Sequence, residues 1–275
     1  MNQENSNISC KIDYHIHTML CNHAKYGMEA YIKKAVLSGF DEICFLDHLT
    51  ISKPGNRHSM APSEVPFYFQ AVQNLKIRYR KVINIKAGLE IDYHPDHIDD
   101  INNIIDTFSF DVIGSSLHFP KGVDVVSHES DWSKGGLETN EIYRLYFEYL
   151  DKMLDNNYFD FICHIDLMKK FGRNLPDCFE KELDEIIKKI AKNNIAVEVN
   201  TSGYDHNAQN AYPSIDILKK CCKYGVGITI GSDAHEPDNI GRHYEKVLPL
   251  ICSAGYKQVC VFTERKRSFI EISAK

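Results

Sequence analysis

Short apolar runs alternate along this chain with longer amphipathic segments. The apolar runs are rich in Ile, Val and Phe and are bounded by polar or glycine-containing turns, which is typical of strands. The predicted strands are residues 10–17, 42–46, 82–91, 110–117, 159–163, 194–199 and 226–230. The amphipathic segments predict helices near residues 28–38, 63–80, 97–106, 138–156, 178–192, 213–223 and 241–253.

The segment 179–192 has the clearest helical pattern. Apolar residues recur in it at i, i+3, i+4 and i+7, with Lys, Glu and Asp on the other face. The apolar positions are Leu183, Ile186, Ile187 and Ile190. We expect this stripe to pack against a core.

Each predicted strand is followed by a predicted helix, seven times in succession. Such alternation is typical of an α/β fold with parallel strands, and a length of 275 residues favours one (β/α) barrel over two independent domains. We therefore expect a single domain over residues 1–275. The tail 257–272 predicts one or two further strands. The longest loops, 50–62 and 119–137, are expected to shape an active-site rim.

The composition is that of an ordinary globular protein, with 43% hydrophobic and 25% charged residues. The formal net charge of -6 argues against a protein built to hold nucleic-acid backbones. The polar start MNQENSNISCK has no apolar signal core, and no apolar run approaches the roughly 18 residues of a membrane span. We expect a cytoplasmic protein that does not contact membranes. The sequence does not indicate an oligomeric state.

The chain has nine cysteines, an odd number, scattered and without a C-x-x-C pair. Reduced, mostly buried thiols in a cytosolic protein are the favoured interpretation. Cys21 lies near His23 and is the one thiol that could approach a metal site, although a packing role is favoured for it as well.

Histidines and carboxylates recur where the predicted strands end. His15 and His17 close the first strand, and because residues i and i+2 of a strand point to one side, both imidazoles face the same point. Asp47 precedes another such histidine. The complete set of candidate ligands is His15, His17, His23, His48, Glu90, His118, His164, Asp233 and His235.

In a barrel the carboxyl ends of the strands converge on one face, where catalytic groups gather. One strand-end histidine is usually structural, but six of the seven predicted strands end in a histidine or carboxylate of this set. The set exceeds the roughly four to six ligands that one ion takes. It therefore favours two or three divalent ions, of Zn, Mn or Fe, with Glu90 and Asp233 as bridging ligands.

The remaining six histidines fall in predicted loops or helix starts and are expected at the surface or the rim. They are His58, His94, His97, His128, His206 and His243. His206, which follows the sixth strand, is also a candidate for contact with substrate.

The ordered motifs DYHIHTMLCNHA, GSSLHF, CHIDLMKKFG and EVNTSG followed by GSDAH span about residues 12–243. They resemble the PHP (polymerase and histidinol phosphatase) superfamily, and within it the histidinol-phosphatase branch. The resemblance implies a distorted, TIM-like (β/α)7 barrel with a trinuclear metal centre. The implied ligand groups are His15, His17, Glu90 and Asp233 for one ion, Glu90, His118 and His164 for a second, and His23, His48 and His235 for a third.

The reaction implied by the resemblance is hydrolysis of L-histidinol phosphate to L-histidinol and phosphate, a step of histidine synthesis. A hydroxide bridging two divalent ions would attack phosphorus while the ions neutralise the developing charge. Glu90 serves catalysis as the bridging ligand. Asp233, His235 or a metal-bound water would supply the proton to the leaving alkoxide, and the sequence does not decide among them.

Arginine suits the phosphate because its planar fork makes two parallel hydrogen bonds. The candidates, in order of preference, are Arg173, Arg242 and Arg57. The amine and imidazole of the substrate call for carboxylate or aromatic partners. Near candidates are Tyr93, Asp92 and Phe119.

Three other function classes are less favoured. A PHP-type phosphoesterase of another substrate, such as a nuclease acting on nucleic-acid ends, is disfavoured by the acidic balance and the missing basic patch. A metal-stabilised partner-binding module should have lost ligands, yet the set is complete. Amidohydrolase-type C–N hydrolysis usually calls for a differently placed His/Asp set and often a metal-bridging lysine.

Overall fold

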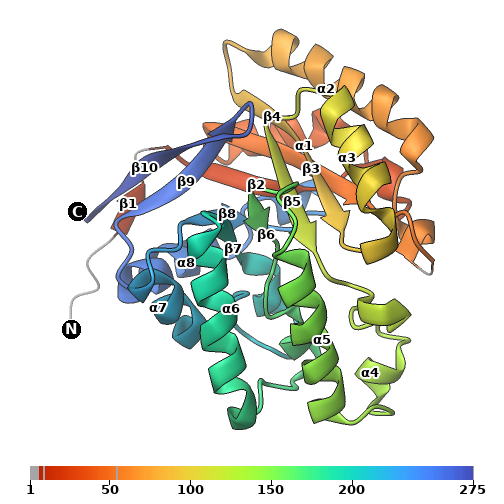
Figure 1. Ribbon diagram of the computed structural model, residues 1–275. Helices are drawn as coiled ribbons and strands as arrows, with labels where there is room; N and C mark the ends of the chain where they lie inside the picture. Colours follow the sequence, from red (N-terminus) through yellow and green to blue (C-terminus); the bar gives the residue numbers. More distant parts are fainter. Residues whose placement is uncertain (1–5, 9, 54, 275) are drawn as a thin grey trace.

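The computed structural model describes residues 6–8, 10–53 and 55–274, and its centre is a sheet of seven parallel strands (Figure 1). In spatial order the strands are β2 (Ile12–Ile16), β3 (Glu42–Leu49), β4 (Asn84–Asp92), β5 (Val112–Ser116), β6 (Phe161–Ile162), β7 (Ala196–Asn200) and β8 (Ile228–Gly231). After β8, Ala234 forms a parallel bridge with Ile16. The sheet thus curls back onto its first strand, and the nearly closed barrel confirms the predicted α/β architecture.

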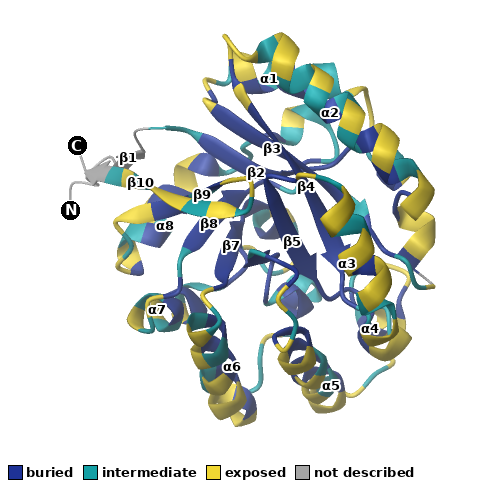
Figure 2. Ribbon diagram, turned by 45° about the horizontal axis from the view of Figure 1, so that its top comes forward, coloured by how far each residue is buried: buried dark blue, intermediate teal, exposed yellow. Residues whose placement is uncertain are grey.

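Helices cover the outside of the barrel, as Figure 2 shows, with their exposed faces outward and the strands almost wholly buried. They are α1 (Met28–Leu37), α2 (Val65–Tyr79), α3 (Ile98–Thr107), α4 (Asp131–Lys134), α5 (Thr139–Met153), α6 (Glu180–Lys192), α7 (Ile215–Lys223) and α8 (Tyr244–Ser253). Seven of these match predicted helices. The short α4 was not predicted and lies in the long loop 119–137.

The apolar stripe of α6 lies in the core, because all four of its predicted positions are buried. Strand bounds differ from the prediction mainly at β3, which continues to Leu49, and at β6, which keeps only two paired residues. The chain leaves β6 early because it turns at His164, whose backbone is in the left-handed region (φ 26°).

The tail forms two strands, as predicted, and joins a small antiparallel sheet in the order β1 (Ser6–Ile8), β10 (Lys266–Ala274), β9 (Gln258–Thr263). The turn between β9 and β10 lies against the amino-terminal side of the barrel. The Lys86 ammonium at the start of β4 donates to Thr263 Oγ1 at 2.6 Å, and the Arg265 amide donates to the Asp111 carbonyl ahead of β5 at 2.9 Å. The small sheet therefore covers the end of the barrel opposite the carboxyl ends of the strands.

The nine cysteines are free thiols, and five of them are buried, in keeping with the prediction. Across the described ranges, no helix combines the length and apolar character needed to span a membrane.

Replacing Gly231, at the end of β8, tests how closely side chains pack at the carboxyl end of the barrel. A Cβ atom at this position would lie 2.6 Å from His15 Cβ and would also overlap the Glu198 carboxylate. We expect Gly231→Ala to lower the free energy of unfolding by about 1–3 kcal/mol, measured by denaturant titration.

Gly27→Ala is the matched control, because a Cβ atom there meets nothing within 4 Å. Its cost should be about 1 kcal/mol or less, since glycine is only a modest helix N-cap. Equal stability of Gly231→Ala and the parent protein would contradict the close packing described here.

Candidate metal centre

The structure brings all nine predicted ligand residues together at the carboxyl ends of the strands. Glu90, at the end of β4, is the central carboxylate of the cluster. His48 Nδ1 and His164 Nε2 approach its oxygens at 2.8 and 2.9 Å, and His15 Nε2 and His118 Nε2 approach at 3.2 and 3.5 Å. Four strand ends thus meet at one buried carboxylate.

The strand register explains this convergence. Glu90 lies directly opposite His48 on β3 and opposite Gly114 on β5. A side chain at Gly114 would collide with Cys163, since its Cβ would lie 2.7 Å from the sulfur. The glycine therefore lets β5 and the segment after β6 approach closely, which brings His164 within reach of Glu90.

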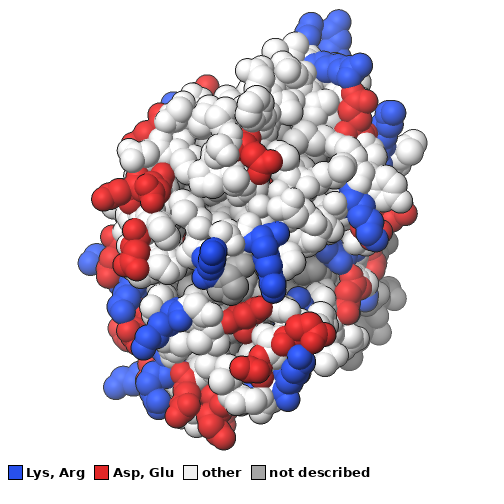
Figure 3. All heavy atoms as spheres, turned by 90° about the vertical axis from the view of Figure 1, so that its right-hand side faces the viewer, with Lys and Arg blue, Asp and Glu red and all other residues white. Residues whose placement is uncertain are grey.

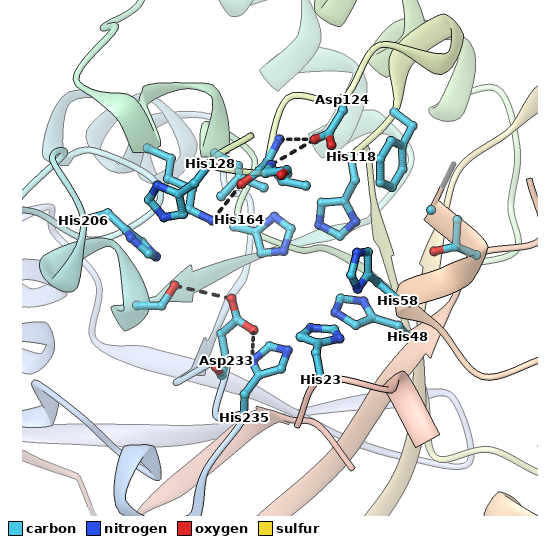
Figure 4. Close-up of a pocket in the computed structure, with 18 of the residues that line it drawn as sticks. His23, His48, His58, His118, Asp124, His128, His164, His206, Asp233 and His235 are labelled. Carbon is cyan, nitrogen blue, oxygen red and sulfur yellow. Dashed lines mark hydrogen bonds and ion pairs between the residues drawn. The ribbon is translucent and has the colours of Figure 1, made fainter. Parts of the chain in front are cut away.

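Asp233 is the second carboxylate of the cluster. Its Oδ1 lies 3.0 Å from His17 Nε2, 3.5 Å from His235 Nδ1 and 3.9 Å from His15 Nε2. The His235 ring stacks on His17 at 4.0 Å, and its centroid lies 4.5 Å from that of His23. Figure 4 shows His23, His48, His118, His164, Asp233 and His235 facing one cavity.

Two of these residues have left-handed backbone conformations, His164 with φ 26° and Asp233 with φ 53°. Such conformations are unfavourable for residues other than glycine and tend to persist at functional sites, where the surrounding structure fixes them. Here they turn the chain sharply at the ends of β6 and β8, so that both side chains enter the cavity.

The hydrogen bonds of the imidazoles fit metal binding. His15 Nδ1 donates to Glu198 Oε1 at 2.6 Å, His23 Nδ1 to the Cys21 carbonyl at 2.8 Å, and His235 Nδ1 to the Asp233 carbonyl at 3.1 Å. A donating Nδ1 leaves the Nε2 lone pair free for a cation, as is usual for metal-bound histidine. His235 Nε2 is buried and has no hydrogen-bond partner among the described residues.

Donor atoms also gather closely enough to share an ion. The groups whose donors all lie within 4.8 Å of one another include His15, His17 and Asp233; His17, His48 and His235; and His15, Glu90 and His164. Cys21 joins His23 and His235 in a further group. Burial raises the pKa of the Cys21 thiol to about 12, which favours the protonated form and a packing role. The assignment of individual ligands stays a prediction.

Two carboxylates beneath the cluster orient the imidazoles. Glu198, in the middle of β7, accepts from His15 and, through Oε2, from the His164 amide at 2.9 Å. Asp47 lies 3.4 Å from His17 Nδ1 and accepts from the Thr18 hydroxyl. Glu198 is absent from the predicted set. The available signal was a carboxylate in the middle of the apolar run AVEV, a position that the structure shows to be fully buried.

Burial keeps several imidazoles neutral. Burial and the neighbouring His48 lower the pKa of His17 to about 3. Burial also holds the pKa values of His118 and His235 well below the usual range of histidine. Neutral imidazole is the form that binds metal, so these three side chains are ready to act as ligands at pH 7.

The carboxylates of Glu90 and Asp233, in contrast, are held ionised. Burial alone would raise the pKa of Glu90, but the imidazoles of His48 and His15 keep it well below its usual range. Burial alone would also raise the pKa of Asp233, but the imidazole of His15 and its neighbours keep it well below its usual range. Burial would lower the pKa of His15, yet Glu198 and Glu90 raise it well above the usual value. A divalent cation at His15 Nε2 would take the place of that proton.

A pocket of about 440 Å³ opens over the cluster. Of the five predicted substrate-contacting residues, Arg57 and His206 lie in its wall, and Arg173, Arg242 and Tyr93 do not. The rim histidines His58 and His128 also line it. The other three lie elsewhere: His94 packs against His97, and His243 pairs with Asp205.

Arg173 and Tyr93 are engaged in packing. The Arg173 guanidinium lies over the Trp132 ring at 4.4 Å and donates to the Leu137 carbonyl at 3.2 Å. Tyr93 is buried, with its ring edge-on to that of Tyr149. These contacts explain why neither side chain lies in the pocket wall.

Arg242 supports the cluster from behind. Its Nε donates to the Ser232 carbonyl at 2.8 Å, Nη2 donates to the Asp233 carbonyl, and Nη1 pairs with Asp205 at 3.0 Å. The guanidinium therefore holds the left-handed turn at Asp233 in place.

Lys170 lines the pocket and is missing from the predicted set. The side chain donates from Nζ to the Val126 carbonyl at 2.9 Å. Burial lowers the pKa of this ammonium group. The available signal was the lysine pair in CHIDLMKKFG, just behind His164. With Arg57 it supplies the cationic side chains of the pocket wall.

Comparisons with known proteins point in one direction. A profile of the PHP domain matches residues 13–202. The chain is 28% identical to a probable histidinol-phosphatase of Deinococcus radiodurans over 92% of this chain and 97% of the relative. It is also 28% identical to the histidinol-phosphatase of Lactococcus lactis, over 93% and 96%.

A solved structure is also similar. It is the histidinol phosphate phosphatase of Lactococcus lactis, crystallised with zinc, L-histidinol and phosphate. The TM-score is 0.83 at 25% sequence identity, over 94% of this chain and 98% of the other.

Replacing Glu90 tests its central position. We expect the purified parent protein to carry about two or more equivalents of transition metal, and Glu90→Ala to lose more than one of them. Elemental analysis of both proteins measures this. Glu90→Gln, nearly the same shape, should lose metal as well, and Glu182→Gln, exposed on α6, should not. An unchanged metal content in both Glu90 variants would contradict a bridging role.

Replacing Glu198 tests the orienting carboxylate. Glutamine offers a single acceptor oxygen where His15 and the His164 amide now use both, so Glu198→Gln should weaken metal binding about 10- to 100-fold. Titration with a chelator measures the affinity, with Glu182→Gln again as the control. Parent-like affinity in a folded Glu198→Gln protein would show that this carboxylate does not position the ligands.

Proposed function

This chain belongs to the PHP domain family, and on that basis we propose that it is a metal-dependent phosphomonoesterase that hydrolyses L-histidinol phosphate to L-histidinol and phosphate. The observation that carries the proposal is the complete set of nine imidazole and carboxylate donors at one end of the barrel, beneath a pocket of small-molecule size. The ligands of the similar Lactococcus lactis structure support the choice of substrate.

The donor set suits two or three divalent ions of zinc, manganese or iron, since imidazole and carboxylate are their usual ligands. Such ions, when bound, supply Lewis-acid charge that activates water and stabilises phosphoryl oxygens. Glu90 and Asp233 are the carboxylates that more than one ion can share, because each faces several imidazoles. Asp233 and His235 both line the pocket; because the structure holds Asp233 ionised and His235 neutral, either would first have to take up the proton of the attacking water before passing it to the leaving alkoxide.

The pocket wall suits a phosphate monoester. The cationic side chains of Arg57 and Lys170 are available for phosphate oxygens that face away from the centre, and the Phe119 ring offers an apolar surface. A volume of about 440 Å³ accommodates a small molecule. Phosphate held between the metal ligands and these cations would leave its ester oxygen toward the rest of the pocket.

A nuclease reading is less well supported. On the face shown in Figure 3, Lys and Arg side chains are interspersed with Asp and Glu and form no continuous basic stripe. The formal net charge is -6. Sequence-independent binding of a nucleic-acid backbone depends on such a stripe. We therefore propose a small-molecule substrate. We also propose that the enzyme is a single domain and acts in the cytoplasm, a reducing compartment that its free thiols fit.

Turnover of three substrates tests the function. The metal-loaded protein should hydrolyse L-histidinol phosphate with a kcat/KM at least about 100-fold above that for p-nitrophenyl phosphate, and should release nothing from a short oligonucleotide. Phosphate release measures the first two. Chelation should abolish the activity, and zinc or manganese should restore it. No turnover of histidinol phosphate together with cleavage of the oligonucleotide would overturn the proposal.

A further inference from the structure

The proposed substrate carries a positive charge that the pocket must accommodate. L-Histidinol phosphate has a primary amine, protonated at neutral pH, on the carbon next to the CH₂ group that bears the phosphate, while its imidazole lies at the far end of the molecule. Asp124 and Asp233 are the two carboxylates in the described pocket wall. Asp233 already faces His15, His17 and His235, so Asp124 is the carboxylate that remains for a cationic ligand.

The hydrogen bonds of Asp124 leave one of its oxygens open. Oδ1 accepts from the amides of Val126 and Ser127, both at 2.9 Å. Within the described ranges, Oδ2 receives no hydrogen bond, and Asp124 forms no ion pair with Lys170, the lysine of the pocket wall. The side chain is half-buried, and Figure 4 shows it at the edge of the cavity beside His118.

The loop that carries Asp124 is tied to the metal centre on both sides. The Val125 amide donates to the His118 carbonyl at 3.1 Å. The Lys170 ammonium, on the segment that follows His164, donates to the Val126 carbonyl at 2.9 Å. Asp124 is therefore held at a fixed place relative to two predicted metal ligands, which is the preorganisation that recognition of a small ligand requires.

Other carboxylates near the cluster lie outside the pocket wall. Asp92 lies beneath His118, buried, and accepts from its amide at 2.7 Å. Glu198 and Asp47 are fully buried behind His15 and His17. These side chains orient imidazoles and do not reach the pocket wall.

We propose that Asp124 Oδ2 binds the protonated amine of the substrate and so selects phosphate monoesters of amino alcohols over neutral esters. The proposal rests on the proposed phosphomonoesterase function and names the side chain that recognises the substrate amine. Phosphate binds at the metal end, the ammonium group binds Asp124, and the Phe119 ring beside His118 covers the carbon skeleton. A site built to pair with a charged group discriminates against analogues that lack it.

Asp124→Asn tests this with little disturbance of the fold. The asparagine oxygen can still accept from the two backbone amides, so the loop keeps its turn, while Oδ2 becomes an NH₂ donor that repels an ammonium group. We expect kcat/KM for L-histidinol phosphate to fall about 10- to 100-fold, mostly through KM. The rate with p-nitrophenyl phosphate should stay within about threefold, since this ester has no amine.

Asp131→Asn is the matched control, because it makes the same charge change on the same loop at an exposed position outside the pocket wall. It should keep parent-like kinetics with both esters. Two analogues separate the amine from the imidazole. L-Phenylalaninol phosphate, which has the amine alone, should lose as much from Asp124→Asn as histidinol phosphate does, and 3-(imidazol-4-yl)propyl phosphate should lose little.

The outcomes distinguish the two proposals. A parent protein inactive on every phosphomonoester defeats the proposed function, and the Asp124 assignment falls with it. A parent that hydrolyses histidinol phosphate, with Asp124→Asn equally impaired on the neutral aryl ester or not impaired at all, overturns the Asp124 assignment alone and leaves this residue a loop-forming one. A fall in kcat/KM confined to 3-(imidazol-4-yl)propyl phosphate also overturns the assignment, since Asp124 would then bind the imidazole ring.

Discussion

The buried charge of Glu90 is the constraint on which the rest of the site depends. Its side chain has no exposed surface, and an ionised carboxylate in that position is strongly unfavourable unless partners surround it. Imidazoles from four different strand ends meet its two oxygens. A parallel barrel delivers such partners from distant parts of the chain, because all its strands end at one face.

Much of this arrangement could be read from the sequence. The strands are short apolar runs, and the H-x-H, D-H and D-A-H motifs stand directly behind them, so topology alone predicts that their side chains converge. The alternation of the first strand places His15 and His17 on one side without any tertiary information. Glu90 and Asp233 followed from the same positional rule.

The supporting residues could not be read in the same way. Glu198 sits in the middle of a strand, where the rule of strand ends does not apply, and its role depends on His15 across the barrel. The direction in which an arginine side chain on a loop points depends on the acceptors near it. The Arg242 guanidinium donates to the carbonyls of Ser232 and Asp233 and does not line the pocket. Lys170 enters the wall because Val126, on another loop, holds it there.

The closure of the barrel between its first strand and the segment after its last has a consequence for biogenesis. His17 and Asp233 lie 216 residues apart in the chain, yet their side chains are 3.0 Å apart. Contacts of such sequence separation form late, since a long loop must close first. During synthesis His15 and His17 therefore cannot contact Asp233 until most of the chain has been made. A chain truncated before Asp233 lacks two of the nine predicted ligands, Asp233 and His235, so the full set can assemble only after most of the sequence has been made.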